Sequence, residues 1–454
     1  MSIQRFARAP LAASLLLASS AVFALPAFPG AEGFGADTVA GRGGRVIAVT
    51  NLNDAGPGSL RAAVETEGPR TVVFRVAGTI HLQSPLAIRH PNITLAGQTS
   101  PGGGVTVAGY TTRIYASDVV LRYMRFRLGN LTKTEDDALG VMHGARRVVI
   151  DHVSAGWSTD ESLSTEGDVA DITIQWSLIA ESLNKSVHAK GAHGYGSLLR
   201  VNGGVSLHHN VYAHHRGRNP RFGDNYFKNT APGSIDFRNN VIYGWGDYAS
   251  GTNDGWININ YVNNYIKPAK YSVLIEPLVM TDKATPDKIQ LFVAGNFMQG
   301  NAAASRDNSR LLGAGAPPDK VKPAPDKYTV AAQAFAAPAV TTWPALDAFI
   351  RVLSDVGASS PWRDSVDLRV IEQVSEGSGR IIDSQEEVGS WPAVPQGTPP
   401  LDTDGDGIPD DWEIAQRLDP KNPADGAKLA RNGYSNLENW LNSLVSSPVA
   451  RPAR

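Results

Sequence analysis

The chain has 454 residues, and its 42 Lys and Arg residues nearly balance its 44 Asp and Glu residues. This balance creates no global field for nucleic acid or an anionic membrane, so we expect neither as a partner. The chain contains no cysteine, which excludes disulfides and thiolate metal sites. We therefore expect its stability to come from packing, backbone hydrogen bonds and bound hard cations.

Residues 1–24 are typical of a secretory signal peptide. Arg5 and Arg8 precede an apolar stretch, and Val22 and Ala24 are the small residues before a cleavage site. The apolar stretch is too short to span a bilayer. We expect the protein to be exported and secreted.

Short segments rich in β-forming residues recur along the chain, each bounded by Gly, Asn or Asp. They include NITLAG, VVLRYMRFR, VVIDHVS, ITIQWSLI, VSLHHNVY, IDFRNNVIY, ININYVNNYI and QLFVAGNF. Asn210, Asn240, Asn264 and Asn296 follow four successive segments, roughly 24 to 32 residues apart. A β-sandwich places its strands closer together, so we predict an all-β fold, a parallel β-solenoid over 25–315. In it the asparagines are expected to stack as a ladder of turn residues in the left-handed conformation.

The composition changes after the predicted solenoid. Residues 316–397 are rich in Pro and Ala, which indicates a linker or an extended wrap along the solenoid. Within this region ALDAFIRVLSDVGA has apolar residues at helical spacing and ends at Gly357. We expect this helix to cap or brace the stack of coils.

Residues 398–446 are predicted to form a calcium-binding module around the stretch DTDGDGIPDDWE. Positions 1, 3, 5, 9 and 12 of an EF-hand loop correspond to Asp402, Asp404, Asp406, Asp410 and Glu413. No long helix precedes the loop, so it resembles thrombospondin-type or dockerin-like modules more than a paired sensor EF-hand. A following amphipathic helix carries Leu437, Trp440, Leu441 and Leu444 on one face, which favours a structural module.

A cationic cluster lies in HHNVYAHHRGRNPRFGDN, just after a strand-like run. Arg216, Arg218 and Arg221 follow the strand, and Lys185 and Lys190 follow the segment before it. Because neighbouring coils of a solenoid are only about 4.8 Å apart, we expect these cations to form one patch. The neighbouring histidines are interpreted as packing and hydrogen-bonding groups rather than zinc ligands: His208, His209, His214 and His215.

Acidic residues precede the cationic cluster by one or two coils. They are Glu135, Asp136 and Asp137 in TEDDALGV, and Asp160 and Glu161 in STDESLS. If Leu163 fills the core, strand alternation points Asp160 outward. Carboxylates and cations then face one cleft, which suits an acidic polysaccharide whose carboxylates bind Arg or are bridged by Ca²⁺ to the protein.

Several motifs together resemble the pectate lyases of the right-handed parallel β-helix lyase family. They are FPGAEGFG, VTNLNDAGPGSLR, ITLAGQTSPGGGV, DDALGV leading to VVIDHVS, and HHNVY followed by RNPR. The resemblance extends from about residue 27 to residue 246. It implies a right-handed parallel β-helix and calcium-assisted β-elimination of polygalacturonate, with Ca²⁺ as cofactor.

The resemblance also implies roles for individual residues. Arg218 matches the first Arg of the family's Arg-x-Pro-x-x-Arg motif, which supplies the base, whereas Gly223 stands at the last Arg. Either Arg221 replaces that arginine in binding substrate or the substrate clamp differs, and the lysine expected beside it is Lys185 or, as second choice, Lys190. Crowding by Ca²⁺, Lys185 and Arg221 is expected to lower the pKa of Arg218, which is otherwise above 12.

The calcium ligands implied by the resemblance are only partly matched. Asp137 and Asp160 correspond to family ligands, and Glu135 or Asp136 to a neighbouring one. Ser164 stands where the family has a further Asp, so the site is expected to be weaker or to be completed by substrate.

Other functions remain open at this stage. A polygalacturonase-like hydrolase on the same fold needs two or three carboxylates for acid and base catalysis, which Asp136, Asp137 and His193 echo only faintly. Another polyuronate lyase and a noncatalytic glycan-binding solenoid are further alternatives. We expect the protein to act as a monomer.

Overall fold

A computed structural model of the protein describes residues 25–223, 231–252, 254–273, 276–280, 284–285, 287–314 and 325–445. The predicted signal peptide, residues 1–24, lies outside the described residues. Within the described ranges, no helix combines the length and apolar character needed to cross a membrane.

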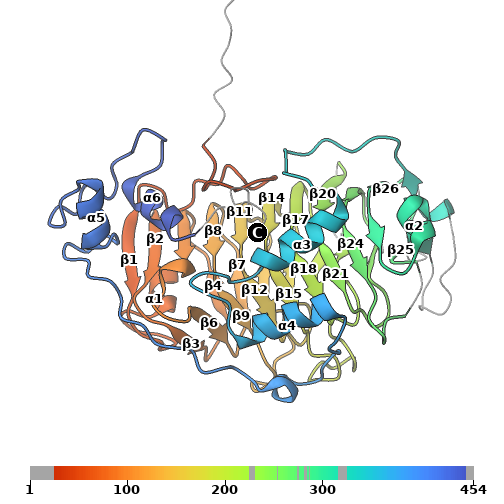
Figure 1. Cartoon of the computed structure of the whole chain (residues 1–454), viewed down its shortest axis with the longest axis horizontal. Helices are drawn as coiled ribbons and strands as arrows, with labels where there is room; N and C mark the ends of the chain where they lie inside the picture. The colour runs from red at the N-terminus through yellow and green to blue at the C-terminus, as the bar shows by residue number, and fades with distance from the viewer. Residues whose placement is uncertain are drawn as a thin grey trace, which may run out of the picture.

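The described strands form three parallel sheets that wind into a β-solenoid (Figure 1). Sheet A contains β1 Arg45–Val49, β2 Arg70–Phe74, β5 Ile93–Ala96, β8 Val119–Arg122, β11 Arg146–Asp151, β14 Ala170–Gln175, β17 Gly204–His208, β20 Gly233–Arg238, β23 Ile257–Val262, β26 Ile289–Ala294 and β29 Thr329–Val330. Sheet B contains β3 Gly78–His81, β6 Val105–Ala108, β9 Arg125–Arg127, β12 Ser154–Gly156, β15 Leu178–Ala180, β18 Val211–Ala213, β21 Val241–Tyr243, β24 Tyr265–Lys267 and β27 Phe297–Met298. Sheet C contains β4 Leu86–Ile88, β7 Thr112–Ile114, β10 Leu139–Val141, β13 Leu163–Thr165, β16 Leu198–Leu199, β19 Arg221–Phe222, β22 Ser250–Thr252, β25 Leu278–Met280 and β28 Leu312–Ala314. The predicted all-β solenoid is confirmed.

Aliphatic rows fill the interior of the solenoid. Val148 pairs with Ile172, Ile172 with Val205, and Val205 with Ile235, and each of these side chains is at most 1% exposed. Burial of a large aliphatic side chain contributes about 1.5–3 kcal/mol, so such rows account for much of the stability of the stack.

The predicted asparagine ladder is also present. Each backbone N–H donates to the side-chain oxygen of the next asparagine: Asn210 to Asn240 at 3.0 Å, Asn240 to Asn264 at 2.9 Å, and Asn264 to Asn296 at 2.9 Å. The left-handed backbone, however, occurs one residue earlier, at His209, Asn239 and Asn263, with φ between 51° and 58°. The ladder asparagines are buried and satisfy backbone groups at the turn, whereas the residue before each of them makes the bend.

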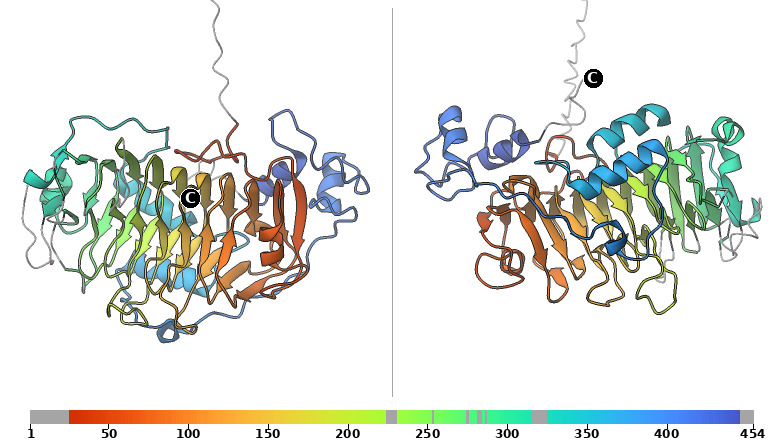
Figure 2. Two further views of the ribbon diagram at one scale, coloured as in Figure 1. Left: turned by 180° about the vertical axis from the view of Figure 1, so that it is seen from behind. Right: turned by 60° about the horizontal axis from the view of Figure 1, so that its bottom comes forward.

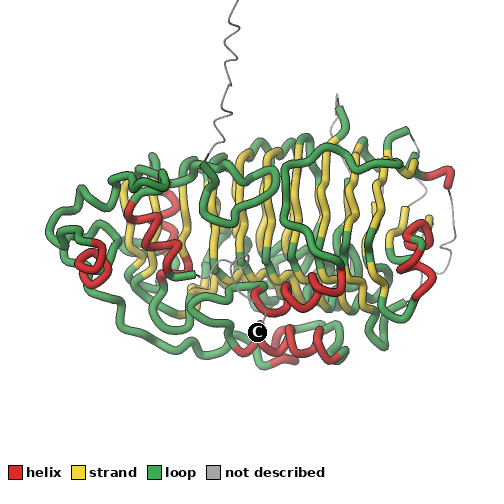
Figure 3. The backbone as a smooth tube through the Cα atoms, turned by 45° about the horizontal axis from the view of Figure 1, so that its top comes forward, coloured by secondary structure: helices red, strands yellow, loops and turns green. Residues whose placement is uncertain are grey.

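Six helices occur in the described part of the chain: α1 Leu60–Glu65, α2 Ala302–Arg306, α3 Ala345–Asp355, α4 Ser365–Glu376, α5 Asp410–Gln416 and α6 Asn436–Ser443. Short 3₁₀ turns are η1 Gly97–Thr99, η2 Asn308–Leu311, η4 Pro325–Lys327 and η5 Gln385–Val388. Helix α3 confirms the predicted bracing helix, and α4 lies beside it (Figures 2 and 3). Val352 of α3 and Val370 of α4 pack against the outward side chains of sheet B, including Val211 and Val241.

After α4 the chain returns along sheet B to the N-terminal end of the solenoid. Pro395 accepts a hydrogen bond from the Gly103 N–H at 2.8 Å, and Gln396 donates to the Ala77 carbonyl at 2.9 Å. Helices α5 and α6 then lie beside β1 and β2 (Figure 1). These C-terminal segments cover sheet B and the first strands of sheet A, and the candidate site lies on sheet C.

Candidate active site

A pocket of about 330 Å³ lies on the outer face of sheet C. It is lined by Arg113, Glu135, Asp136, Asp137, Gly140, Met142, Asp160, Glu161, Ser164, Thr165, Glu166, Lys190, His193, Leu198, Arg200 and Arg218. Strand alternation places the outer row of this sheet in the pocket, because the neighbouring Leu139, Leu163 and Leu199 are fully buried in the core. In that outer row Arg113 pairs with Gly140, and Gly140 pairs with Ser164.

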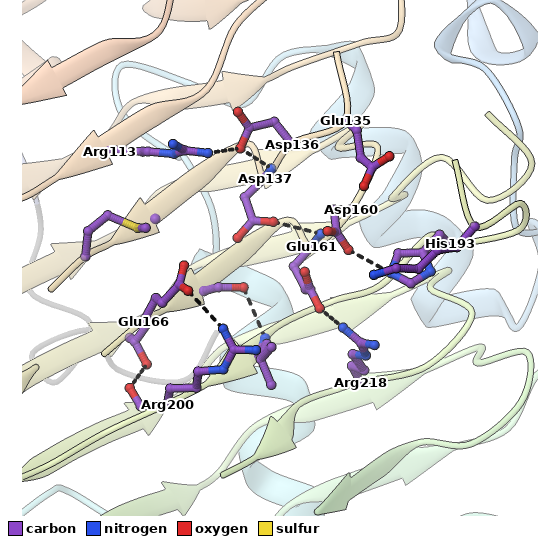
Figure 4. A pocket seen from close by; sticks show the side chains of 16 residues that line it. Arg113, Glu135, Asp136, Asp137, Asp160, Glu161, Glu166, His193, Arg200 and Arg218 are labelled. Atoms are coloured by element: carbon purple, nitrogen blue, oxygen red, sulfur yellow. Dashed lines mark hydrogen bonds and ion pairs between the residues drawn. The ribbon is translucent and has the colours of Figure 1, made fainter. Parts of the chain in front are cut away.

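Three carboxylates converge in this pocket (Figure 4). Asp137 precedes β10, and Asp160 and Glu161 precede β13, so the parallel register brings them to the same level of adjacent coils. One oxygen from each lies within 4.8 Å of the others. Asp137 Oδ1 also accepts a hydrogen bond from the Glu161 N–H at 3.0 Å.

The pKa values of the three carboxyl groups are shifted by burial and by their closeness to one another and to neighbouring charged residues. Burial raises the pKa of Asp137 well above its ordinary value, and the charges of Glu161 and Asp160 add to this effect. Burial also raises the pKa of Glu161 to about 7, although Arg218 opposes the shift. Burial alone would raise the pKa of Asp160, but the neighbouring His193, Glu161 and Arg218 together outweigh burial, so this pKa is lowered. Crowded oxygen donors of this kind fit a hard cation such as Ca²⁺.

Asp136 and Glu135, the other two acidic residues predicted as metal ligands in the solenoid, line the pocket, but each contacts a basic side chain instead of the carboxylate cluster. Asp136 Oδ1 pairs with Arg113 Nη2 at 2.6 Å. Glu135 Oε1 lies 3.0 Å from His188 Nε2, and its Oε2 accepts from the Ala189 N–H at 2.9 Å. The structure therefore joins two of the four nominated residues in one cluster and adds Glu161 to them.

Arg218 lies directly beside this cluster. Its guanidinium pairs with Glu161 and lies over the Tyr195 ring, with Cζ 3.9 Å from the ring centroid. The residue adopts a left-handed backbone, with φ of 58°, just before the cis peptide bond to Pro220. Burial alone lowers the pKa of Arg218, but the Glu161 carboxylate outweighs it, so the pKa is raised. The lowering of this pKa by Ca²⁺, Lys185 and Arg221 stays a prediction, and the charge that contacts Arg218 directly is the Glu161 carboxylate.

The three basic residues that were predicted to bind substrate lie at different positions relative to the pocket. Lys190 lines the pocket, whereas Lys185 is an exposed residue outside the lining whose N–H donates to Asp383 Oδ1 at 2.9 Å. Arg221 pairs with Leu198, so it extends the outer row of sheet C by one strand. At Gly223, with φ of 90°, an added Cβ would approach the Asp254 carbonyl oxygen to 2.4 Å, which explains why no arginine stands there.

Two histidines that the sequence analysis did not propose as partners of the acids lie beside them. His193 Nε2 lies 3.1 Å from Asp160 Oδ1. His188 Nδ1 accepts from the Lys190 N–H at 3.1 Å, so the neutral ring carries its proton on Nε2, which faces Glu135 and Asp160. The four histidines interpreted as packing groups are buried and hydrogen-bonded: His208, His209, His214 and His215.

The C-terminal acids form two further groups that share Asp406. One contains Asp402, Asp404 and Asp406, and the other contains Asp406, Glu413 and Asp425. Asp410 lies outside both groups, and its carboxylate accepts from the Thr403 N–H at 2.7 Å and from the Thr403 hydroxyl at 2.6 Å. Burial raises the pKa of Glu413 to about 7, with the charge of Asp406 adding to the effect.

Comparison with known proteins places the chain among relatives of similar length. No family model matches it. It is 37% identical over 433 residues to a probable pectate lyase C of Aspergillus flavus, covering 94% of this chain and 96% of that protein. It is 38% identical over 447 residues to a probable pectate lyase C of Neosartorya fischeri, covering 97% and 98%. A pectate lyase from Bacillus sp. N165, solved in complex with trigalacturonate, aligns with a TM-score of 0.49 and 14% identity over 72% of this chain and 98% of that one. On the extent of its identity to the fungal proteins, the chain belongs to the pectate lyase family.

Proposed function

We propose that the protein cleaves polygalacturonate, the de-esterified form of pectin, by calcium-assisted β-elimination with Arg218 as the base. The observation that carries this proposal is the convergence of three carboxylates beside a buried arginine on the outer face of sheet C. Membership of the pectate lyase family supports the substrate class.

Asp137, Asp160 and Glu161 are the residues that would hold the cation. Their oxygens are the hard donors that Ca²⁺ prefers, and burial together with mutual repulsion raises the pKa of Asp137 and of Glu161, an unfavourable crowding that a bound cation would relieve. Bound calcium supplies positive charge for the uronate carboxylate and thereby acidifies the neighbouring C5–H. His188 and His193 hold Glu135 and Asp160 in place.

Arg218, in its unprotonated form, accepts the proton from C5 of the uronate. The electron pair of the C5–H bond forms the C4–C5 double bond, and the C4–O bond breaks. The departing glycosidic oxygen takes up a proton from solvent water and becomes the C1 hydroxyl of a new reducing end, and Arg218 later returns its proton to solvent. Because Glu161 raises the pKa of Arg218, the reaction requires Glu161 to be engaged as a ligand instead of as the partner of Arg218.

Substrate carboxylates that extend from the reacting sugar need cationic partners along the same face. Lys190 lines the pocket, and Arg221 lies in the outer row one strand beyond Leu198. A guanidinium binds a carboxylate with two parallel hydrogen bonds, which suits Arg221 as the clamp. Lys185, the other lysine proposed to bind substrate, is exposed and does not line this pocket.

A glycoside hydrolase is the second candidate, and the spacing of the carboxylates disfavours it. Hydrolases place their two carboxyl groups about 5–5.5 Å apart for retention or about 6.5–9.5 Å apart for inversion. In this protein the oxygens of Asp137, Asp160 and Glu161 gather within 4.8 Å, which suits one cation better than a separated acid and base.

Incubation with polygalacturonate and Ca²⁺ tests the proposal. A lyase produces an unsaturated end that absorbs ultraviolet light together with each new reducing end. Highly methylated pectin is the matched control, because esterification removes the carboxylate charge, and it should be cleaved poorly. New reducing ends without absorbance would identify a hydrolase, and neither product would identify a glycan-binding protein.

We also propose that the enzyme is secreted and acts as a monomer on extracellular polysaccharide. The basic and apolar pattern of residues 1–24 supports export. We further propose that the loop from Asp402 to Glu413 binds a second Ca²⁺ with a structural role, on the basis of its EF-hand spacing and its converging carboxylates.

A further inference from the structure

We propose that Asp425, outside the EF-hand-like loop, completes the C-terminal calcium site, and that the bound cation fastens the module to the N-terminal end of the solenoid. This inference rests on the calcium loop proposed above. It adds Asp425, which lies outside the loop spacing, to the metal ligands. It also assigns the bound metal a structural role in attaching the module to the solenoid.

Hydrogen bonds to Asp402 and Asp406 hold the backbone of the EF-hand-like loop in a tight turn. Asp402 Oδ1 accepts from the Gly405 N–H at 2.8 Å, and its Oδ2 accepts from the Gly407 N–H at 3.2 Å. Asp406 Oδ1 accepts from the Ile408 N–H at 2.9 Å. These hydrogen bonds fix the conformation of the turn. They leave Oδ2 of Asp406 available to bind a cation.

Buried carboxylate oxygens that lack a hydrogen-bond partner in the protein indicate that a cation binds here. Glu413 is 0% exposed, and neither of its carboxylate oxygens has a hydrogen-bond partner. Asp406 Oδ2 and Asp425 Oδ1 also lack a partner, and these two residues are 7% and 3% exposed. Burying an ionised carboxylate without a compensating charge or hydrogen bond is costly, and these three acids share one small volume.

The donor set selects the class of cation. Because the two acidic groups share Asp406, five carboxylates form one continuous set: Asp402, Asp404, Asp406, Glu413 and Asp425. All of the donors are oxygens, which favours Ca²⁺ over transition metals that prefer nitrogen or sulfur. Asp425 thus takes the place that the loop spacing assigns to Asp410, whose carboxylate is engaged by Thr403.

The approach of Asp425 depends on the residue that follows it. A Cβ at Gly426 would lie 2.2 Å from Asp406 Oδ2, so a side chain at this position would displace the Asp406 carboxylate from its place beside Asp425. The Gly426 carbonyl accepts from the Leu437 N–H at 3.0 Å, and the Asp425 carbonyl accepts from Asn436 Nδ2 at 2.9 Å. Asp425 is therefore tied directly to the first residues of α6.

Both segments joined by the cation site rest on the first coils. Ile408 from the loop packs with Leu437 and Trp440 of α6 against Val73 and Ala96 on the outer face of sheet A. Ion pairs add to this contact: Arg42 Nε with Glu438 Oε1 at 2.7 Å, and Arg75 Nη1 with Asp402 Oδ2 at 3.6 Å. A cation bound by both the loop and Asp425 would therefore hold together the loop and α6, the two segments that contact the first coils.

The test uses full-length protein carrying Asp137→Asn, so that the active-site cluster contributes less to calcium binding. In this background we compare Asp425→Asn, Glu413→Gln and the control Asp411→Asn, which removes an exposed acid outside both groups. Calcium affinity is measured by calorimetry, and thermal midpoints are recorded with calcium and with EDTA. Hydrogen exchange of β1 and β2 reports on the docking.

We expect Asp425→Asn to weaken calcium binding by about tenfold or more and to lose most of the calcium-induced rise in the midpoint, as Glu413→Gln does. The Asp411→Asn control should keep both. Calcium removal should accelerate exchange in β1 and β2 of the background protein. If Glu413→Gln loses binding while Asp425→Asn keeps it, the loop binds calcium without Asp425 and the inference is wrong. If the background protein binds no calcium at this module, the loop proposal itself is wrong, and unchanged exchange would refute the fastening role.

Discussion

Arg218→Lys provides the sharpest test of the proposed chemistry. The substitution keeps the positive charge beside Glu161, so we expect the fold and substrate affinity to persist. The guanidinium of Arg218 is held by Glu161 on one side and by the Tyr195 ring, 3.9 Å from Cζ, on the other. Lysine carries a point charge without that plane, so it cannot place a lone pair where the guanidinium nitrogen stood.

The expected magnitude follows from this geometry. Misplacement of a reacting group by about 1 Å costs on the order of a hundredfold in rate, which is also the lower bound expected for loss of a general base. A hundredfold loss corresponds to about 2.7 kcal/mol of transition-state stabilisation. We therefore expect kcat to fall by at least this factor while KM changes little.

The assay is initial-rate ultraviolet absorbance on polygalacturonate with saturating calcium, and circular dichroism checks the fold. Arg216→Lys is the matched control, because Arg216 lies two residues away, pairs with Asp247 at 2.6 Å and is not among the pocket residues. Arg221→Lys should chiefly raise KM, because a clamp binds ground state and transition state alike. Near wild-type turnover in Arg218→Lys, with an inactive Arg221→Lys, would refute the assignment of the base.

Further predictions concern the cation, Glu161 and the C-terminal module. Excess EDTA should abolish turnover before the β-solenoid unfolds, because backbone ladders and aliphatic rows hold the coils; full activity in EDTA, followed alongside circular dichroism, would contradict this. Glu161→Gln should raise the calcium concentration needed for half-maximal rate, since it removes one charged ligand, and an unchanged calcium dependence would exclude Glu161 from the site. Trp440→Ala should lower the free energy of unfolding by about 3 kcal/mol in chemical denaturation, because this 6% exposed side chain packs on the first coils. Its kcat at room temperature should stay near that of the wild type, and a large loss of kcat would show that the module acts on the site.

The fold was predictable because its signals repeat along the chain. Each β-rich segment adds one coil, and the spacing of Asn210, Asn240 and Asn264 in the sequence gives the number of residues in each coil. The conformation within the turn was not predictable from the ladder alone, because two adjacent polar residues compete for the left-handed position. Helix α4 was missed although Asp364 caps its start and Gly377 ends it in the left-handed conformation.

The candidate site was predictable where a residue lies in a stretch that resembles a family motif. Asp137, Asp160 and Arg218 meet this condition. Glu161 does not, because alternation counted back from Leu163 assigns it to the core side, whereas β13 begins only at Leu163. The residue instead forms an isolated bridge with Tyr195 on the next coil and turns its carboxylate toward Arg218.

Long-range contacts limited the C-terminal prediction in the same way. Loop spacing identifies Asp402, Asp404, Asp406 and Glu413, because an EF-hand loop is a local structure. Asp425 joins Asp406 and Glu413 only through tertiary packing of the segment before α6, which no spacing rule describes. A DG pair, Asp425 followed by Gly426, was a visible turn signal, but it did not indicate a partner.

The buried histidines predict how the solenoid responds to acid, and His215 provides the clearest case. Its Nδ1 accepts from the Ser182 N–H at 3.3 Å, and its Nε2 faces the Ile179 carbonyl oxygen at 2.9 Å, so the neutral ring satisfies both contacts. Burial lowers the pKa of His215 to about 4, against about 6.5 in the unfolded chain. The folded state then binds fewer protons between these two values, so stability is complete above pH 6.5 and declines as the pH falls toward 4.

This shift corresponds to a loss of about 3 kcal/mol across that pH window. Urea midpoints measured from pH 7 to pH 4 in saturating calcium should show the decline, and His215→Gln, which cannot titrate, should show a smaller one from a lower starting stability. His81→Gln serves as the control, because the His81 side chain is exposed and its replacement should leave the wild-type slope unchanged. Equal slopes in the wild type and in His215→Gln would mean that His215 does not become protonated as the solenoid unfolds in acid.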